Sequence, residues 1–263
     1  MRKRKKEKVF IMQRWEKIVS IILIIIVAAF VVDIGRYFFY PDIKYLKKYN
    51  PEKTAFMKYR EISWEQKKVK RKIRKVWVPL SQVSPYVTKA VIISEDHKFW
   101  THEGFDFEAM QMALEKNITQ NKVKVGGSTI SQQLAKNLFL TPEKDPIRKI
   151  KEAILTWRLE KHLSKRRILE IYLNVAEWGD GIFGIEMAAR NHYGRSASQL
   201  TAREAATLAV ILPNPRLYRT DGSSRYVQNQ ADRIYRIMVR QGVVNEYEDT
   251  VKDDDYFIPW IYK

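Results

Sequence analysis

The sequence predicts a mainly α-helical protein in which one transmembrane helix precedes a helical domain. Three observations support this class. A charge-free apolar run occupies residues 18–32, apolar residues recur at helical spacing from residue 84 onward, and there is little of the alternation that is typical of strands. The chain has 263 residues and is 45% hydrophobic, which can supply the core of one good-sized domain with additional segments.

The N-terminal region has the organisation of a membrane anchor. A cluster of Lys and Arg within residues 1–17 precedes the apolar run, and aromatic residues flank the run as interfacial anchors do. Crossing the hydrocarbon core takes about 20 apolar residues, so we place the span at 18–38. Residues 30–33 form a poor cleavage site, which favours an uncleaved anchor over a cleaved signal peptide. The basic tail predicts a cytoplasmic N-terminus and an external domain.

The net charge of +18 indicates an anionic partner, such as lipid headgroups, a phosphorylated substrate or nucleic acid. The basic run at 67–75 is either a solvated face or a strip that lies against anionic lipid. The absence of cysteine excludes disulfides, thiol catalysis and a Cys-based zinc site.

Helix starts can be read from local signals. We predict helices that begin after Ser84 with Pro85 at the first position, after Ser128 (extending to about Phe139), at Pro146, and after Thr201 in a capping box. Residues 168–173 are apolar on nearly all sides, which predicts a central helix. The resulting segments are a basic tail (1–17), a transmembrane anchor (18–38), a connector (39–75), a helical domain (76–223) and a C-terminal extension (224–263).

Adjacent carboxylates, Glu95 and Asp96, follow an apolar helix. A partly desolvated carboxylate there would have a raised pKa and could accept a proton from a sugar hydroxyl. The alternative is an ordinary solvated or capping pair. His97 and His102 lack the usual spacing of a helical metal-ligand pair, which favours a hydrogen-bonding role for His102.

Two further segments carry polar groups suited to an anionic ligand. Gly126-Gly127 leads into a helix whose N-terminus could bind an anion, with Thr129, Gln133 and Lys136 on one face. The alternative is an ordinary amphipathic helix after a glycine turn.

The second of these segments contains Glu152, which has Arg148 and Lys149 three to four residues before it. This is either a surface ion pair or a carboxylate kept ionised among cations that bind a pyrophosphate. Glu170 and Asn174, further along the chain, are interpreted as a buried polar pair that Arg190 could satisfy.

Taken together, these segments resemble the peptidoglycan glycosyltransferases of family 51. The resemblance covers about residues 76–218 and rests on several motifs in the expected order, with one departure, His192, where the family often has a large aromatic residue. The motifs are Glu95-Asp96-x-x-Phe99-x-x-His102-x-Gly104, Gly126 to Gln133 with Lys136-Asn137, Arg148-Lys149-x-x-Glu152, Lys165 to Asn174, and Ala188-Ala189-Arg190 with Tyr193-Gly194.

The resemblance implies a lysozyme-like helical domain with a small membrane-touching subdomain. It implies polymerisation of lipid II into glycan strands by inverting β-1,4 transfer, with release of undecaprenyl pyrophosphate. By the same resemblance Glu95 is the general base and Glu152 the second essential carboxylate. The residues expected to bind substrate are Asp96, Phe99, His102, Thr129, Gln133, Lys136, Asn137, Arg148 and Lys149.

The implied partners are lipid II, the growing strand, the membrane and other cell wall synthesis proteins, with no nucleic acid. The sequence requires no cofactor and shows no dedicated metal cage, although a divalent cation, Mg²⁺ or Mn²⁺, is compatible with the chemistry. The resemblance places the catalytic domain on the external side of the bacterial cytoplasmic membrane. Ser-x-x-Lys and Lys-Thr-Gly motifs of a transpeptidase are absent, which indicates a monofunctional protein.

Two rival functions remain open at this point. One is a lysozyme-like lytic enzyme that cuts peptidoglycan with Glu95 as the acid. The other is a non-catalytic basic protein that binds a membrane or DNA, as the charge of +18 would allow.

Overall fold

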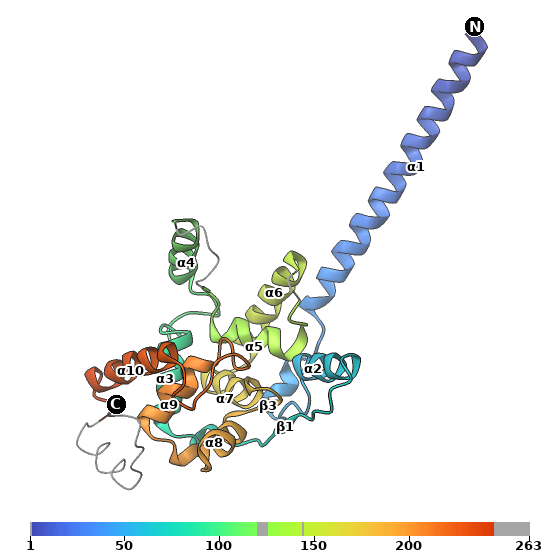
Figure 1. Cartoon of the computed structure of the whole chain (residues 1–263). Coiled ribbons are helices and arrows are strands. Elements are labelled where there is room, and N and C mark those ends of the chain that lie inside the picture. Colours follow the sequence, from blue (N-terminus) through green and yellow to red (C-terminus); the bar gives the residue numbers. More distant parts are fainter. Residues whose placement is uncertain (1, 120–125, 144, 245–263) are drawn as a thin grey trace.

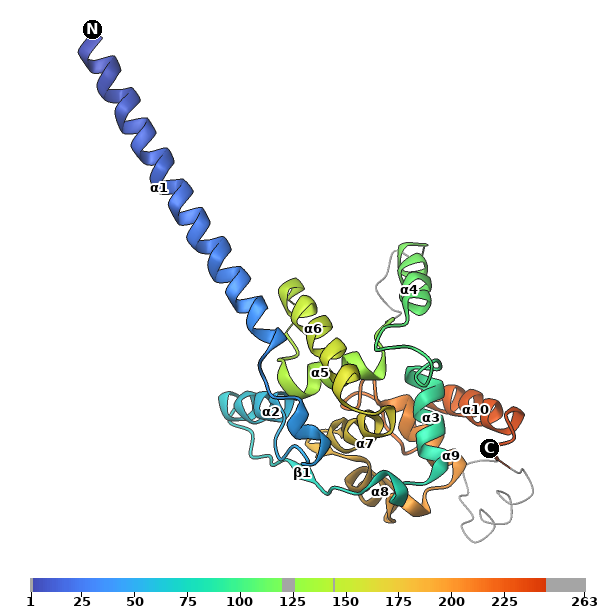
Figure 2. The ribbon, with the colours of Figure 1, turned by 180° about the vertical axis from the view of Figure 1, so that it is seen from behind.

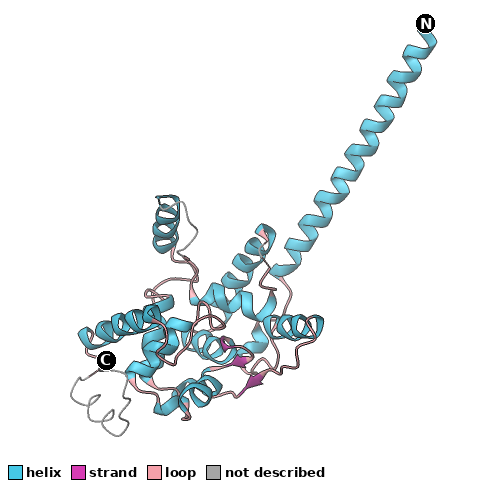
Figure 3. Cartoon of the chain, in the orientation of Figure 1, coloured by secondary structure: helices cyan, strands magenta, loops and turns pink. Residues whose placement is uncertain are grey.

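The computed structural model describes residues 2–119, 126–143 and 145–244, and most of its elements are helices (Figures 1 and 3). This confirms the mainly α class. The α-helices are α1 (Arg2–Gly35), α2 (Ala55–Gln66), α3 (Pro85–Glu95), α4 (Phe107–Thr119), α5 (Ile130–Phe139), α6 (Pro146–His162), α7 (Lys165–Val175), α8 (Ile185–Tyr193), α9 (Ala202–Ile211) and α10 (Arg225–Arg240). Short 3-10 turns are η1 (Arg36–Phe38), η2 (Lys44–Lys47), η3 (Leu80–Gln82) and η4 (Ala197–Gln199).

Helix α1 projects away from the rest of the chain in both views (Figures 1 and 2). The candidate span Trp15–Phe38 runs from α1 through η1 and contains an 18-residue window with a mean hydropathy of 3.0, so its length and composition suit a membrane span. Helix α4 and the N-terminal end of α6 project toward the same side. Apolar side chains of α4 are exposed there, notably Phe107, Leu114 and Ile118.

The core of the domain surrounds α7. Ile168, Leu169, Ile171 and Leu173 are completely buried, which confirms the predicted central helix. Helix α5 packs against α6 and α7, and α3 packs against α9 and α10. Burial of this apolar surface is the main stabilising contribution, at about 25 cal/mol per Å².

Three short strands form the small sheet of the described residues. The strands are β1 (Arg74–Lys75), β2 (Glu177–Gly179) and β3 (Ile182–Phe183), and β3 lies between the other two. It pairs in parallel with β1 and antiparallel with β2. Strands of two or three residues leave little alternation to detect in the sequence.

Three of the four predicted helix starts are confirmed. Ser84 precedes Pro85 at the start of α3, Pro146 begins α6, and Thr201 forms a capping box with Glu204. The fourth is shifted by one residue, because Thr129 rather than Ser128 is the N-cap of α5. The Thr129 hydroxyl accepts a hydrogen bond from the backbone N–H of Gln132, and the Thr129 backbone N–H donates to Gln132 Oε1.

The predicted partner of the buried polar pair is wrong. Arg190 forms an ion pair with Glu186. Glu170 instead pairs with Arg167 and accepts from the Leu80 amide at 2.9 Å. The amide group of Asn174 bonds both the N–H and the carbonyl of Val78. The pair therefore fastens the segment that leads into α3 onto the central helix.

The segment between anchor and domain contributes to the core. Thr54 caps α2, which buries Met57 and Trp64, while Ile43 and Leu46 are buried before it. At the other end, α10 packs against α9 and α3. Of the predicted C-terminal extension, residues 245–263 lie outside the described residues.

Candidate active site

Glu95 is the last residue of α3 and is partly exposed. Its Oε2 accepts a hydrogen bond from Gln133 Nε2 at 2.7 Å. Desolvation raises the pKa of Glu95, and the neighbouring Asp96 charge acts in the same direction. The Gln133 bond and the charge of Lys136 oppose that rise. A carboxylate in such a site is suited to accept a proton while still reaching solvent.

Asp96 is buried and joins three parts of the site. Its carboxylate accepts from His102 Nε2 at 2.9 Å and from the backbone N–H of Ile130 at 2.9 Å. His102 Nδ1 accepts from the Gly104 amide at 3.0 Å, so Nε2 carries the proton that His102 donates to Asp96. This confirms the hydrogen-bonding role expected for His102. The network fixes the end of α3, and with it Glu95, against the start of α5.

The hydrogen bond from the Ile130 amide to Asp96 changes the interpretation of the glycine turn. The sequence predicts that the N-terminus of α5 is free to bind an anionic ligand, but Asp96 and Thr129 already accept from its Ile130 and Gln132 amides. The anion at this helix start is therefore Asp96. Gly127 allows a close approach instead, because a Cβ there would lie 2.9 Å from the Met110 Cα of α4.

Glu152 lies on α6 and is 3% exposed. Arg148 Nη1 donates to its Oε2 at 3.0 Å, and Lys149 Nζ contacts its Oε1. Both carboxylate oxygens are thus held by cations of the same helix. Lys149 is about half exposed and also lies 3.4 Å from Ser128 Oγ, so part of this positive charge faces solvent. A buried carboxylate paired in this way keeps two cations in place for an anionic ligand.

Lys136 lies on α5, one turn from Gln133, the residue that bonds Glu95. Burial, the largest effect, lowers the pKa of Lys136, while the charges of Glu152 and Glu95 raise it. Arg148 and Lys149 act in the same direction as burial. The positive group of α5 therefore lies in the shared electrostatic field of the acidic residue on α3 and the cationic set on α6.

The other predicted substrate-binding residues are distributed around this centre. Thr129 is buried, and its hydroxyl donates to the Gly104 carbonyl at 2.7 Å. Phe99 is completely buried, with its ring edge-on to His102. Asn137 is 9% exposed and lies on the same helix as Lys136. Contact of these residues with substrate stays a prediction.

Sequence reasoning missed Tyr172 as a residue of this site. It is 1% exposed on α7, and its hydroxyl donates to Gln133 Oε1 at 2.9 Å. The signal was present, since a tyrosine on an otherwise apolar central helix needs a hydrogen-bond partner. A second missed group is Glu160, which pairs with Lys165 at 2.6 Å and accepts from Ser131 of α5.

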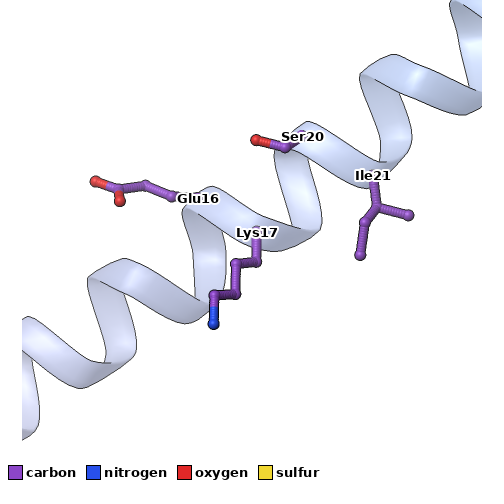
Figure 4. Close-up of a pocket in the computed structure, with 4 residues that line it drawn as sticks. All are labelled: Glu16, Lys17, Ser20 and Ile21. Atoms are coloured by element: carbon purple, nitrogen blue, oxygen red, sulfur yellow. The ribbon is translucent and has the colours of Figure 1, made fainter.

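Two hollows of the surface lie away from this centre. One lies along α1, where Glu16, Lys17, Ser20 and Ile21 extend from a single helix without a facing wall (Figure 4). The other has a volume of about 110 Å³ and is lined by residues of α2, the segment after it, the β2–β3 turn and the segment after α9. Neither includes Glu95, Lys136 or Glu152.

No group of three or more His, Asp or Glu side chains suited to a metal ion occurs among the described residues. Because both oxygens of Glu152 are engaged by cations, this carboxylate does not fit the role of a protein metal ligand.

Comparison with known proteins is consistent with this geometry. A family model described as transglycosylase matches residues 58–239. A protein named biosynthetic peptidoglycan transglycosylase from Nitrosospira multiformis is 47% identical over 204 residues, which cover 78% of this chain and 89% of the relative. Proteins with the same name from an Azoarcus species and from Dechloromonas aromatica are 49% and 51% identical, covering 74% and 67% of this chain and 84% and 76% of theirs.

The matched region spans α3 to α6 and therefore includes Glu95, Asp96, Lys136 and Glu152. It begins within α2 and ends within α10, so elements on either side of the predicted domain 76–223 are part of the match. From this match and the identity of its relatives, the chain belongs to the transglycosylase family.

Proposed function

We propose that this chain is a peptidoglycan glycosyltransferase that polymerises lipid II into glycan strands during cell wall synthesis. The observation that carries the proposal is that α5 links the two charged sets: its Gln133 bonds Glu95 at 2.7 Å, and Lys149, which pairs with Glu152, lies 3.4 Å from Ser128 just before it. It gives the site a proton acceptor on one side and a cationic group on the other, as an in-line displacement at a sugar phosphate requires.

In the proposed reaction, Glu95 removes the proton from the 4-hydroxyl group of the acceptor's glucosamine. The oxygen then attacks C1 of the donor's muramyl sugar, and the bond from C1 to the undecaprenyl pyrophosphate breaks with inversion. The leaving oxygen takes the electron pair of that bond. Lys136, Arg148 and Lys149 meet the negative charge that develops on the pyrophosphate. The proton remains on Glu95 until solvent removes it.

The raised pKa of Glu95 suits this role, because a stronger base takes the hydroxyl proton more readily. The direction of this pKa shift also sets the pH range in which the enzyme works. Glu95 must be ionised to act, so activity falls when the pH drops below its raised pKa. Asp96 and His102 hold Glu95 in place, and no step is assigned to a protein-bound metal.

We place the enzyme at the bacterial cytoplasmic membrane, with α1 as the anchor and the domain outside. Both substrates carry lipid chains, so an enzyme held at the bilayer meets them at high local concentration. The exposed apolar side chains of α4, on the side toward which α1 projects, support the placement of this face at the lipid surface.

The test is incubation of the purified full-length chain with lipid II in lipid vesicles, comparing the wild type with Glu95→Gln. We expect long glycan strands from the wild type and none from the variant. Shortened strands from preformed peptidoglycan would instead support a lytic enzyme. Parallel reactions with EDTA, Mg²⁺ or Mn²⁺ decide whether a divalent cation contributes.

A further inference from the structure

The C-terminal end of α1 contacts α6, the helix that carries Glu152. Side chains of α1 are exposed from Trp15 to Val32, and burial begins at Asp33. Lys151 Nζ on α6 lies 2.5 Å from Asp33 Oδ2, and the same ammonium group lies 5.3 Å from the centre of the Tyr37 ring. Asp33 also pairs with Arg36 of its own segment through Oδ1 at 3.0 Å, so α6 supplies the partner of the second carboxylate oxygen at the end of the apolar span.

A second contact lies two turns further along α6. Arg158 is 7% exposed, and its Nη1 and Nη2 donate to the carbonyl oxygens of Tyr37 and Phe39 at 2.9 and 3.0 Å. Carbonyl groups that follow a helix end lack partners within the helix, so a guanidinium group fits them well. Phe38 adds an edge-on ring contact with Trp157, with centroids 6.4 Å apart.

These contacts and the cationic site share one rigid element. Lys151 immediately precedes Glu152, so their side chains leave α6 about 100° apart around the helix axis. One side of α6 is therefore fastened to the anchor, while the adjacent side holds Arg148 and Lys149 against Glu152. If the anchor tilts in the bilayer, α6 tilts with it and the position of Glu152 relative to the bilayer changes.

We propose that Lys151 and Arg158 are positioning residues that make the anchor and α6 one rigid unit, which sets the height and orientation of Glu152 over the bilayer. The anchor then does more than retain the enzyme at the membrane. This inference rests on the proposed function, because it assumes that the lipid-linked donor is bound beside Glu152. The opposing model is a flexible tether, in which the domain moves freely about residues 33–39.

The first experiment measures the docking without using activity. Since the chain has no cysteine, spin labels can be placed at Val31→Cys on α1 and Arg166→Cys on α7 of the full-length protein in vesicles. We expect one narrow distance distribution in the otherwise unaltered chain and a broad one after Lys151→Ala with Arg158→Ala. Lys58→Ala with Arg225→Ala removes two exposed cations of α2 and α10 and should leave the distribution narrow.

A distribution that is already broad in the unaltered chain, or one that stays narrow without Lys151 and Arg158, would overturn the inference. Asp33→Asn provides a second variant that leaves α6 unchanged and removes the same ion pair. It should broaden the distribution partially, and Lys151→Arg should keep it narrow.

The second experiment measures polymerisation of lipid II in bilayers of dimyristoleoyl, dioleoyl and dierucoyl phosphatidylcholine, which differ in thickness. A rigidly docked anchor tilts to match the bilayer, so the wild-type rate should show an optimum thickness. The Lys151→Ala, Arg158→Ala variant should lose that optimum, with kcat on the order of tenfold lower in the best bilayer. An unchanged optimum in this variant would contradict the inference.

The two experiments separate the proposals. If the wild type makes no strands in any bilayer, the proposed function is wrong, and the spin-label distances still decide whether the anchor is docked. If strands form and the distances do not depend on Lys151 and Arg158, the function stands and the positioning role is wrong.

Discussion

The Tyr172 hydroxyl donates a hydrogen bond to Gln133 Oε1 at 2.9 Å, and this bond decides which end of the Gln133 amide faces Glu95. With its oxygen held, the amide presents Nε2 to Glu95 Oε2 at 2.7 Å. Burial raises the pKa of Tyr172 well above its ordinary value, so the hydroxyl stays a donor. A residue of the central helix thereby sets the environment of a carboxylate on α3.

Removing that donor should alter the pH dependence of the enzyme. In Tyr172→Phe the Gln133 amide is free to turn, and the hydrogen bond that lowers the pKa of Glu95 is weakened. We expect the acid limb of the kcat/KM profile to move to higher pH, with the rate at neutral pH about tenfold lower. Tyr226→Phe, on the exposed side of α10, is the control. An acid limb that does not move would show that Tyr172 has no influence on Glu95.

Glu95→Gln should abolish polymerisation and stabilise the fold at alkaline pH. Because the folded-state pKa of Glu95 is raised, its contribution to stability is most favourable below the unfolded pKa and is lost as pH rises through the folded pKa. Glutamine cannot ionise, so the variant avoids that loss. Thermal unfolding at acidic and alkaline pH measures the effect, which should appear only at the higher pH. An equal Tm difference between variant and wild type at both pH values would count against burial of a charged Glu95.

Lys136→Met should impair use of the donor. The substitution removes the positive charge that lies in the field of Glu95 and Glu152 while keeping an unbranched side chain. We expect kcat/KM for lipid II to fall about 10²–10³-fold, because charge on the departing pyrophosphate is no longer met. Lys89→Met on α3 is the matched control. Steady-state kinetics equal to the wild type would rule out a phosphate-binding role for Lys136.

Asp96→Asn should destabilise the chain. Both carboxylate oxygens of Asp96 face donors, because His102 Nε2 lies 2.9 Å from Oδ1 and 3.0 Å from Oδ2, and the Ile130 amide donates to Oδ2, so an asparagine must direct its NH₂ group at one of these donors. The loss should be about 1–3 kcal/mol in denaturant unfolding. Asp145→Asn at the exposed N-cap of α6 is the same substitution where asparagine caps as well as aspartate, and should change little. Similar losses in both variants would contradict the special role of Asp96.

Much of the helical organisation was predictable because its signals are local. The capping box at Thr201, the proline starts of α3 and α6, and the apolar residues of α7 each depend on residues within a few turns. The error at the start of α5 was a single residue, because Ser128 and Thr129 are both good caps and only the Gln132 bond distinguishes them.

The sequence alone determined the helical class, the apolar span and the order of motifs, because periodicity, capping and apolar length are properties of neighbouring residues. Only the tertiary structure decided that Gln133 bonds Glu95 from 38 residues away, that Asp96 occupies the start of α5, and that Arg158 holds the end of the anchor from 121 residues away. Such contacts depend on how helices pack, and buried polar groups take whichever partner that packing brings within reach.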